Sequence, residues 1–247
     1  MNTLFTGQTL IQLNKVESTN KFAFELLADS RVLEGTVIAA VEQTSGRGQR
    51  GNSWISEPGK NLTLSIILKP SFLPAIMQFQ LNKALSLAVR DFFLKFNIID
   101  VTVKWPNDIY INGNKVSGIL IENQLKNARI TYSIAGIGIN INQERFLGDF
   151  NAVSLKEITG MEYDLQDCLA ILCESVEKRY LQLRAGQNLD DEYLQHLYRY
   201  NTQCDFLVGE LLMKGKITGI SPEGKLIIEH GRGVLKKYDL KEISFYP

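Results

Sequence analysis

Several residue types that carry specific chemistry are scarce in this chain of 247 residues. It has three cysteines, Cys168, Cys173 and Cys204, which form no C-x-x-C pair, and two histidines. An odd number of cysteines without such a pair predicts reduced thiols in a cytoplasmic protein and not a disulfide framework. The histidines, His196 and His230, lie far apart in sequence, which argues against a zinc site and against a histidine-dependent nucleophile.

Long apolar runs and an excess of one charge are also absent from the sequence. No stretch approaches the roughly 18 consecutive apolar residues of a membrane-spanning helix, and the N-terminus shows no signal-peptide pattern. Lys+Arg and Asp+Glu both number 27, so net charge does not indicate nucleic acid or an anionic membrane as a partner. We therefore expect a cytoplasmic protein that binds neither DNA nor membranes.

Apolar periodicity predicts a mixed α/β domain over residues 1–200. Strands are expected at 11–13, 35–41, 62–68, 101–104, 108–111, 115–122 and 130–141, and helices from about 18, at 77–96, 164–184 and 190–200. Asn112-Gly113 predicts a tight turn between two of the strands. From residue 201 to 247, short strands separated by turn signals predict a small β-barrel.

One glycine-bearing loop is the most informative stretch: Gln43-Thr44-Ser45-Gly46-Arg47-Gly48-Gln49-Arg50-Gly51-Asn52-Ser53-Trp54. Its glycines let the backbone approach a ligand closely, and its two arginines supply positive charge, which suits a phosphate or a carboxylate. It is not a Walker-type loop, because no Gly-Lys-Ser/Thr follows, and it precedes a strand where a dinucleotide fingerprint requires a helix. On composition alone, a flexible surface loop with solvated arginines is an equally good interpretation.

A second polar stretch, Lys104-Trp105-Pro106-Asn107-Asp108, joins two predicted strands. Pro106 would interrupt the strand and expose Asn107 and Asp108, and a hairpin would bring Lys115 close to them. Two lysines, two arginines and an aspartate in one cleft could neutralise a triphosphate and its magnesium. Taken singly, each lysine is more simply explained as a solubilising charge at a strand end.

Two shorter motifs each allow two interpretations. Ser18-Thr19-Asn20 is typical of a helix N-cap, and the same side chains could hydrogen-bond a polar ligand. Gly136-Ile137-Gly138-Ile139-Asn140 could form a β-bulge or could leave room for a ligand on the strand. Trp54 and Trp105 are expected to pack semi-buried and to wall a pocket. These residues indicate an anion-binding α/β enzyme and do not identify its substrate.

Together, these motifs resemble those of the biotin–protein ligases. The order and spacing agree over about residues 10–145 for Ser18-Thr19-Asn20, Gln43 to Trp54, Lys104 to Asp108 followed by Lys115, Gly118 and Glu122, and Gly136 to Asn140. The resemblance implies a mixed sheet flanked by helices, related to class II aminoacyl-tRNA synthetases. It also implies a small C-terminal SH3-like barrel.

The resemblance implies that biotin is activated with ATP as biotinyl-5'-AMP and then passed to a lysine of a biotin carboxyl carrier domain. Biotin binding is assigned to Ser18, Thr19, Asn20, Gln43, Gly46, Arg47, Gly48, Gln49, Lys115, Gly118 and Gly138. ATP or adenylate binding is assigned to Arg47, Gln49, Arg50, Trp54, Lys104, Asn107, Asp108, Lys115 and Asn140. Catalysis is assigned to Lys115, Arg47 and Asp108, because a cation between the biotin carboxylate and the α-phosphate stabilises their developing charge. Mg²⁺ would be bound through the ATP phosphates near Asp108, without a protein metal site, and a homodimer is compatible with the family.

Two positions depart from the family's pattern, because many members carry arginine where this chain has Gln49 and Asn52. Without a cation at Gln49, we expect either compensation by Arg47 and Lys115 or looser retention of the adenylate. Some members place a DNA-binding winged helix before the catalytic domain. Since Ser18-Thr19-Asn20 already occurs within the first twenty residues, we expect a ligase without DNA binding.

Two alternatives remain open at the level of the sequence. A lipoate or octanoate ligase would share the fold and also modify an acceptor lysine. A non-catalytic biotin-binding module would keep the fold without the reaction.

Overall fold

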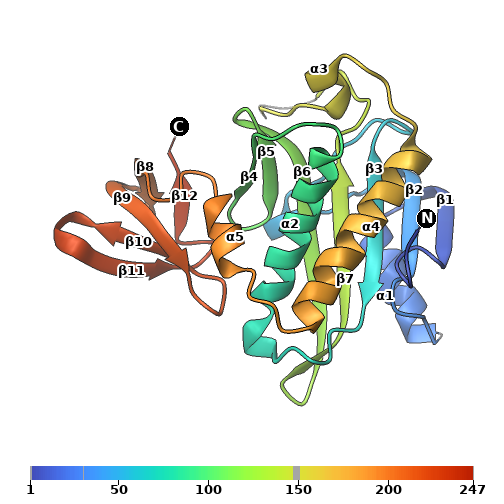
Figure 1. The fold of residues 1–247 in the computed structure, drawn as a ribbon, viewed down its shortest axis with the longest axis horizontal. Helices are drawn as coiled ribbons and strands as arrows, with labels where there is room; N and C mark the ends of the chain where they lie inside the picture. The colour runs from blue at the N-terminus through green and yellow to red at the C-terminus, as the bar shows by residue number, and fades with distance from the viewer. Residues whose placement is uncertain (1, 30, 147–150, 247) are drawn as a thin grey trace.

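The computed structural model describes residues 2–29, 31–146 and 151–246, and it contains two sheets (Figure 1). The larger sheet has the strand order β1-β2-β3-β7-β6-β5-β4. Its strands are β1 (Leu10–Val16), β2 (Val37–Gln43), β3 (Leu62–Leu68), β4 (Val101–Lys104), β5 (Asp108–Ile111), β6 (Asn114–Lys126) and β7 (Arg129–Ile139). β1 and β2 pair in parallel and the other neighbours pair antiparallel. The predicted mixed sheet is therefore confirmed.

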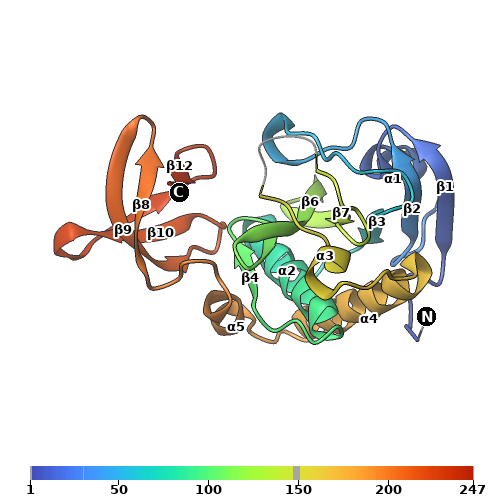
Figure 2. The same ribbon diagram turned by 90° about the horizontal axis from the view of Figure 1, so that it is seen from above.

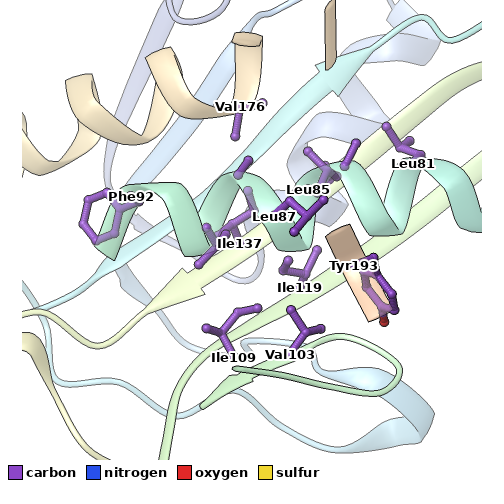
Figure 3. Packing of buried hydrophobic residues seen from close by; sticks show 14 of the residues in the cluster. Leu81, Leu85, Leu87, Phe92, Val103, Ile109, Ile119, Ile137, Val176 and Tyr193 are labelled. Atoms are coloured by element: carbon purple, nitrogen blue, oxygen red, sulfur yellow. The ribbon is translucent and has the colours of Figure 1, made fainter. Parts of the chain in front are cut away.

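Helices cover both faces of this sheet. α2 (Phe79–Leu94) and α4 (Leu165–Arg184) lie side by side on one face, and α1 (Thr19–Asp29) packs on the other, against β2, β3 and β7 (Figure 2). Apolar residues at helical spacing on α2, among them Leu81, Leu85 and Phe92, are fully buried against the sheet. Figure 3 shows these side chains above Ile119 and Ile137. Among the described residues, no helix is long and apolar enough to cross a membrane.

The ends of two helices show how local sequence sets their bounds. Asp164 Oδ1 accepts hydrogen bonds from the backbone N–H groups of Gln166 and Asp167, at 2.7 and 2.9 Å, and so begins α4 as predicted. The short helix α3 (Leu155–Thr159) was not predicted, although Ser154 and Glu157 form a capping box at its start.

The second sheet follows α5 (Asp190–Gln195) and is entirely antiparallel, with the order β11-β10-β9-β8-β12. Its strands are β8 (Gln203–Val208), β9 (Leu211–Ile220), β10 (Leu226–His230), β11 (Val234–Tyr238) and β12 (Ile243–Phe245). These agree with the short strands expected at the C-terminal end. β11 and β12 are the edges of the sheet, so its closure into an SH3-like barrel and the domain boundary between residues 200 and 201 stay predictions.

The predicted helix over 190–200 is wrong in its second half. α5 ends at Gln195, after which Leu197 forms a β-bridge with Val103 and Tyr200 forms one with Ile217. Backbone groups that pair with strands in this way are not available to a helix. The segment thereby joins the two sheets next to β4.

α5 itself is fixed by ion pairs whose cations are buried. Lys83 Nζ on α2 lies 2.7 Å from Asp190 Oδ1. Arg179 on α4 contacts Asp91 Oδ2 at 2.7 Å and Glu192 Oε1 at 2.6 Å. These contacts hold the element that leads to the second sheet against the two core helices.

Candidate active site

A cavity of about 390 Å³ opens on the sheet face that α1 partly covers. Ile134 packs in the cluster around α1, and side chains two residues apart on a strand share a face, so Gly136 and Gly138 of β7 face the cavity. The loop over residues 44–54 crosses this face, on the opposite side of the sheet from α2 and α4 (Figure 2).

The cavity brings together nearly all of the residues that sequence motifs singled out. It is lined by Ser18, Thr19, Asn20, Gln43, Arg47, Gly48, Gln49, Trp54, Lys104, Asn107, Asp108, Lys115, Gly118, Gly138 and Asn140. Gly46 is not among the lining residues; a Cβ there would overlap the carbonyl oxygen of Trp54. The side chain of Arg50 lies outside the described part of the chain.

Lys115 and Asp108 form an ion pair in this cavity, with 2.6 Å between Nζ and Oδ1. Asn112 and Gly113 turn β5 into β6 with φ values of 51° and 77°, as the Asn-Gly signal predicts. A bulge between Ile109 and Tyr110 shifts the register, so that Asp108 pairs with Gly118 whereas Lys115, nearer the Asn112-Gly113 turn, pairs with Tyr110. The Lys115 side chain therefore reaches back along β6 to the carboxylate.

The backbone of Lys115 is also held from outside the hairpin. Its N–H donates to the carbonyl oxygen of Asn151 at 2.7 Å, and its carbonyl accepts from Val153 N at 2.9 Å. The side chains of Lys115 and Asp108 are 28% and 26% exposed, so the pair is partly withdrawn from water while open to a ligand. Lys115 Nζ lies 5.8 Å from the centre of the Trp54 ring.

Trp54 lies on glycines of two neighbouring strands. A Cβ at Gly138 would come within 2.6 Å of Trp54 Cζ2, and one at Gly118 would lie 3.2 Å from Cζ3. β7 pairs in continuous register with both neighbours at 136–139, which excludes the β-bulge interpretation of the Gly-Ile-Gly motif. These glycines make room for an indole whose buried Nε1 has no hydrogen-bond partner among the described residues.

A polar network forms the other end of the cavity. Gln43 Oε1 accepts from Thr19 N at 2.8 Å and from Thr19 Oγ1 at 3.0 Å. Ser65 Oγ lies 2.6 Å from Asn20 Oδ1, and Asn20 Nδ2 donates to Glu122 Oε2 at 2.8 Å. Glu122 Oε1 in turn lies 3.3 Å from Arg47 Nη1. Such linked groups fix the orientation of one another's donors and acceptors.

Lys104 occupies an aromatic cage at the seam between the two sheets. Its Nζ lies 3.2 Å from the Tyr110 hydroxyl, and 4.7, 5.9 and 5.4 Å from the ring centres of Tyr110, Tyr198 and Phe245. Burial lowers the pKa of Lys104, opposed by Asp108 and reinforced by Lys115. Burial also raises the pKa of Tyr110 to about 12. Among the described residues, Lys104 forms no ion pair with a carboxylate, and cation–π contacts stabilise its ammonium instead.

Sequence motifs did not identify the lining residues contributed by the C-terminal sheet. These include Phe206, Leu226, Ile243 and Phe245, and Leu240 lies between β11 and β12. As apolar residues of short strands they carry no local signal that distinguishes a cavity wall from a core position. Glu122 carries a signal, because it falls within the motifs that resemble the family, but the resemblance assigns it no role.

The described residues do not offer a protein metal centre. No group of three His, Cys, Asp or Glu among them could hold a metal ion, and Asp108 is the acidic residue among those that line the cavity. Mg²⁺ typically uses one or two carboxylates together with substrate phosphates. The donor set therefore fits a magnesium ion that arrives with a nucleotide.

Comparison with known proteins places this arrangement in a family. Residues 13–140 match the model of the biotin/lipoate A/B protein ligase family. A bifunctional ligase/repressor BirA from Bacillus spizizenii is 34% identical over 246 residues, which cover 96% of this chain and 74% of that protein. A biotin–[acetyl-CoA-carboxylase] ligase from Mycobacterium tuberculosis is 28% identical, over 89% of this chain and 84% of that protein.

A solved structure agrees with the sequence comparison. The biotin protein ligase from Aquifex aeolicus in complex with biotin and ATP superimposes with a TM-score of 0.79 and 29% identity, covering 97% of this chain and 99% of that one. The similarity thus extends over the cavity and over both sheets. The chain belongs to the biotin/lipoate A/B protein ligase family, and within it to the biotin protein ligases.

Proposed function

We propose that the protein is an ATP-dependent ligase that forms biotinyl-5'-AMP and transfers biotin to the acceptor lysine of a biotin carboxyl carrier domain. The observation that carries this proposal is the Lys115–Asp108 ion pair beside Trp54, in a cavity whose far end is a network of amide and hydroxyl groups. The ligase relatives, and a similar structure that holds biotin and ATP, support it.

In the first step, a carboxylate oxygen of biotin forms a bond to the α-phosphorus of ATP while the bond to the departing pyrophosphate breaks. Lys115 would lie between the two anions, where a cation reduces their repulsion and stabilises the charge of the transition state. Asp108 aligns the Lys115 ammonium through the 2.6 Å contact. Mg²⁺ bound through the phosphates would offset further negative charge.

The two ends of the cavity suit the two substrates. Ser18, Thr19, Asn20 and Gln43 present hydroxyl and amide groups to the ureido ring of biotin, while Arg47, Gly48 and Gln49 cover the reacting groups. Trp54 packs beside the adenine, with Lys104, Asn107 and Asn140 toward the nucleotide. The loop over residues 44–54 limits access of water, which would hydrolyse the mixed anhydride.

In the second step, the amine of the acceptor lysine attacks the acyl carbon of the adenylate. A new C–N bond forms, the bond to the phosphate oxygen breaks, and AMP leaves. The attacking amine is neutral and gives up one proton as the amide forms, and the Asp108 carboxylate is the acidic group among the described lining residues that is available to accept it. An acceptor domain of a carboxylase agrees with the name of the mycobacterial relative.

We also propose that the protein is cytoplasmic and forms a homodimer. The three cysteines are free thiols, which suits the reducing cytoplasm where carboxylases and ATP are found. β1 is an edge strand of the large sheet, and pairing of edge strands is one route to a homodimer.

Biotin-dependent exchange of pyrophosphate into ATP tests the proposal, with lipoate in place of biotin as the second substrate. Exchange with biotin that is nearly abolished in Lys115→Ala would support it. The matched control is Lys216→Ala, because Lys216 also forms one ion pair and is 33% exposed. Exchange with lipoate alone would favour the lipoate ligase alternative, and no exchange with either acid would favour a non-catalytic module.

A further inference from the structure

Glu122 is not among the residues that line the cavity, yet its carboxylate contacts two residues that do. Oε2 accepts a hydrogen bond from Asn20 Nδ2 at 2.8 Å, and Oε1 lies 3.3 Å from Arg47 Nη1. Asn20 lies at the start of α1, Arg47 in the loop over residues 44–54, and Glu122 on β6. One carboxylate therefore connects three elements that are distant in sequence.

The contact with Glu122 determines how the Asn20 amide is oriented. Asn20 is 4% exposed and lies on Gly136, where any Cβ would overlap its side chain. An ionised carboxylate can only accept hydrogen bonds, so Glu122 keeps the NH₂ group of Asn20 toward itself. The amide oxygen is thereby turned to Ser65 Oγ, at 2.6 Å.

The contact with Arg47 attaches the loop to the sheet. Beyond Ser45, the backbone hydrogen bonds that the loop forms with described residues run within it: Gly48 N donates to Asn52 O at 2.7 Å and Trp54 N to Gly46 O at 2.9 Å. Among the described side chains of the loop, Arg47 forms the ion pair with the sheet. A guanidinium carries several N–H donors, so those that do not face Glu122 stay available to a ligand.

We propose that Glu122 is a positioning residue that couples closure of the 44–54 loop to the orientation of Asn20. The inference rests on the proposed function, because Asn20 and Arg47 act on the substrate. A ligand that binds at Asn20 fixes the carboxylate, and the fixed carboxylate lowers the entropic cost of holding Arg47 over the cavity. By reciprocity, closure of the loop strengthens binding at the Asn20 end.

Hydrogen exchange of the loop amides tests the coupling without any reaction. Glu122→Gln keeps an oxygen that accepts from Asn20 and removes the charge that holds Arg47. In the ligand-free protein we expect residues 46–54 to exchange about two- to fivefold faster, the range of a partly exposed ion pair. Glu229→Gln is the matched control, since Glu229 is also a strand residue with one cationic partner and 36% exposure, against 37% for Glu122. Equal exchange in Glu122→Gln and the wild type would overturn the proposal.

A double-mutant cycle separates coupling from a general loss of order. In an Arg47→Ala background, Glu122→Gln should have no further effect on hydrogen exchange of the loop, and an undiminished effect would show that Glu122 acts by another route.

In steady-state assays, Glu122→Gln should raise KM for biotin by a larger factor than it lowers kcat; the reverse would contradict a positioning role. Absence of any pyrophosphate exchange in the wild type would overturn the proposed function, while the ligand-free exchange result would still decide the role of Glu122.

Discussion

The indole Nε1 of Trp105 donates a 2.9 Å hydrogen bond to the carbonyl oxygen of Gly224. Trp105 lies in the turn after β4, next to Asn107 and Asp108, and Gly224 lies in the turn between β9 and β10. Gly224 has a φ of 93°, and a Cβ there would overlap Phe79 on α2. The second sheet thus braces the turn that carries Asp108 and is itself held close to a core helix.

Trp105→Phe tests this brace. The variant keeps an aromatic ring but leaves the Gly224 carbonyl without its buried donor, so the free energy of unfolding should fall by about 1–2 kcal/mol. Urea denaturation measures the change, and Tyr246→Phe, which alters a partly exposed aromatic residue, is the control. An unchanged midpoint in Trp105→Phe would mean that another donor reaches the carbonyl.

Lys104→Met should separate stability from activity. The substitution removes a half-buried charge that has aromatic rings and a hydroxyl around it, and we expect a gain in stability of about 1 kcal/mol together with weaker use of ATP. Thermal unfolding and KM for ATP are the measurements. Loss of stability at neutral pH would contradict the expectation.

The difference in stability between Lys104→Met and the wild type should depend on pH, with a defined sign. Because burial lowers the pKa of Lys104 in the folded protein, its charged form reduces stability below that pKa. The wild type recovers this stability as the pH rises from the folded pKa toward the ordinary value of 10.5. The advantage of Lys104→Met should therefore shrink over that interval and stay constant at lower pH.

Gly138→Ala should displace the Trp54 indole from the floor of the cavity. Overpacking of this kind costs about 1–3 kcal/mol, so kcat/KM for ATP should fall roughly tenfold or more. Gly118→Ala is a graded control, since its Cβ would lie 3.2 Å from Trp54 Cζ3 and a small shift would accommodate it. Equal kinetics in the two variants would show that the position of the indole does not limit the reaction.

Gln49→Arg addresses the departure from the family's pattern. Gln49 lines the cavity, and an arginine there would add a cation toward the phosphate of the adenylate. If the glutamine leaves the intermediate loosely held, the variant should release biotinyl-5'-AMP several-fold more slowly in a single-turnover trap experiment. Equal release rates would show that Arg47 and Lys115 already compensate.

Local signals in the sequence were sufficient for most elements that shape the cavity. Asn112-Gly113 predicts the hairpin that returns Lys115 to Asp108, and Asp164 predicts the start of α4. The side-chain partners of these residues follow from register and packing between distant segments. The bulge at Ile109 and Tyr110 is one such case, because it determines where Lys115 points and leaves no compositional mark.

The contributions of the C-terminal segment were the least predictable. Tyr198 and Phe245 surround Lys104 because α5 ends early and the following residues join strands of both sheets. A helical pattern continues in the sequence through this segment, but tertiary pairing of the backbone overrides it. The capping box of α3 can be read from the sequence, whereas the cage around Lys104 requires the folded chain.

Trp54 and Trp105 are the two tryptophans of the sequence, and both line the cavity. Indole emission responds to the polarity and charge around the ring, so the tryptophan fluorescence of the protein originates where substrates are expected to bind. In Trp105→Phe, tryptophan emission would come from Trp54 alone, next to the Lys115 ammonium. Ligand entry and departure could then be followed in real time without an attached dye.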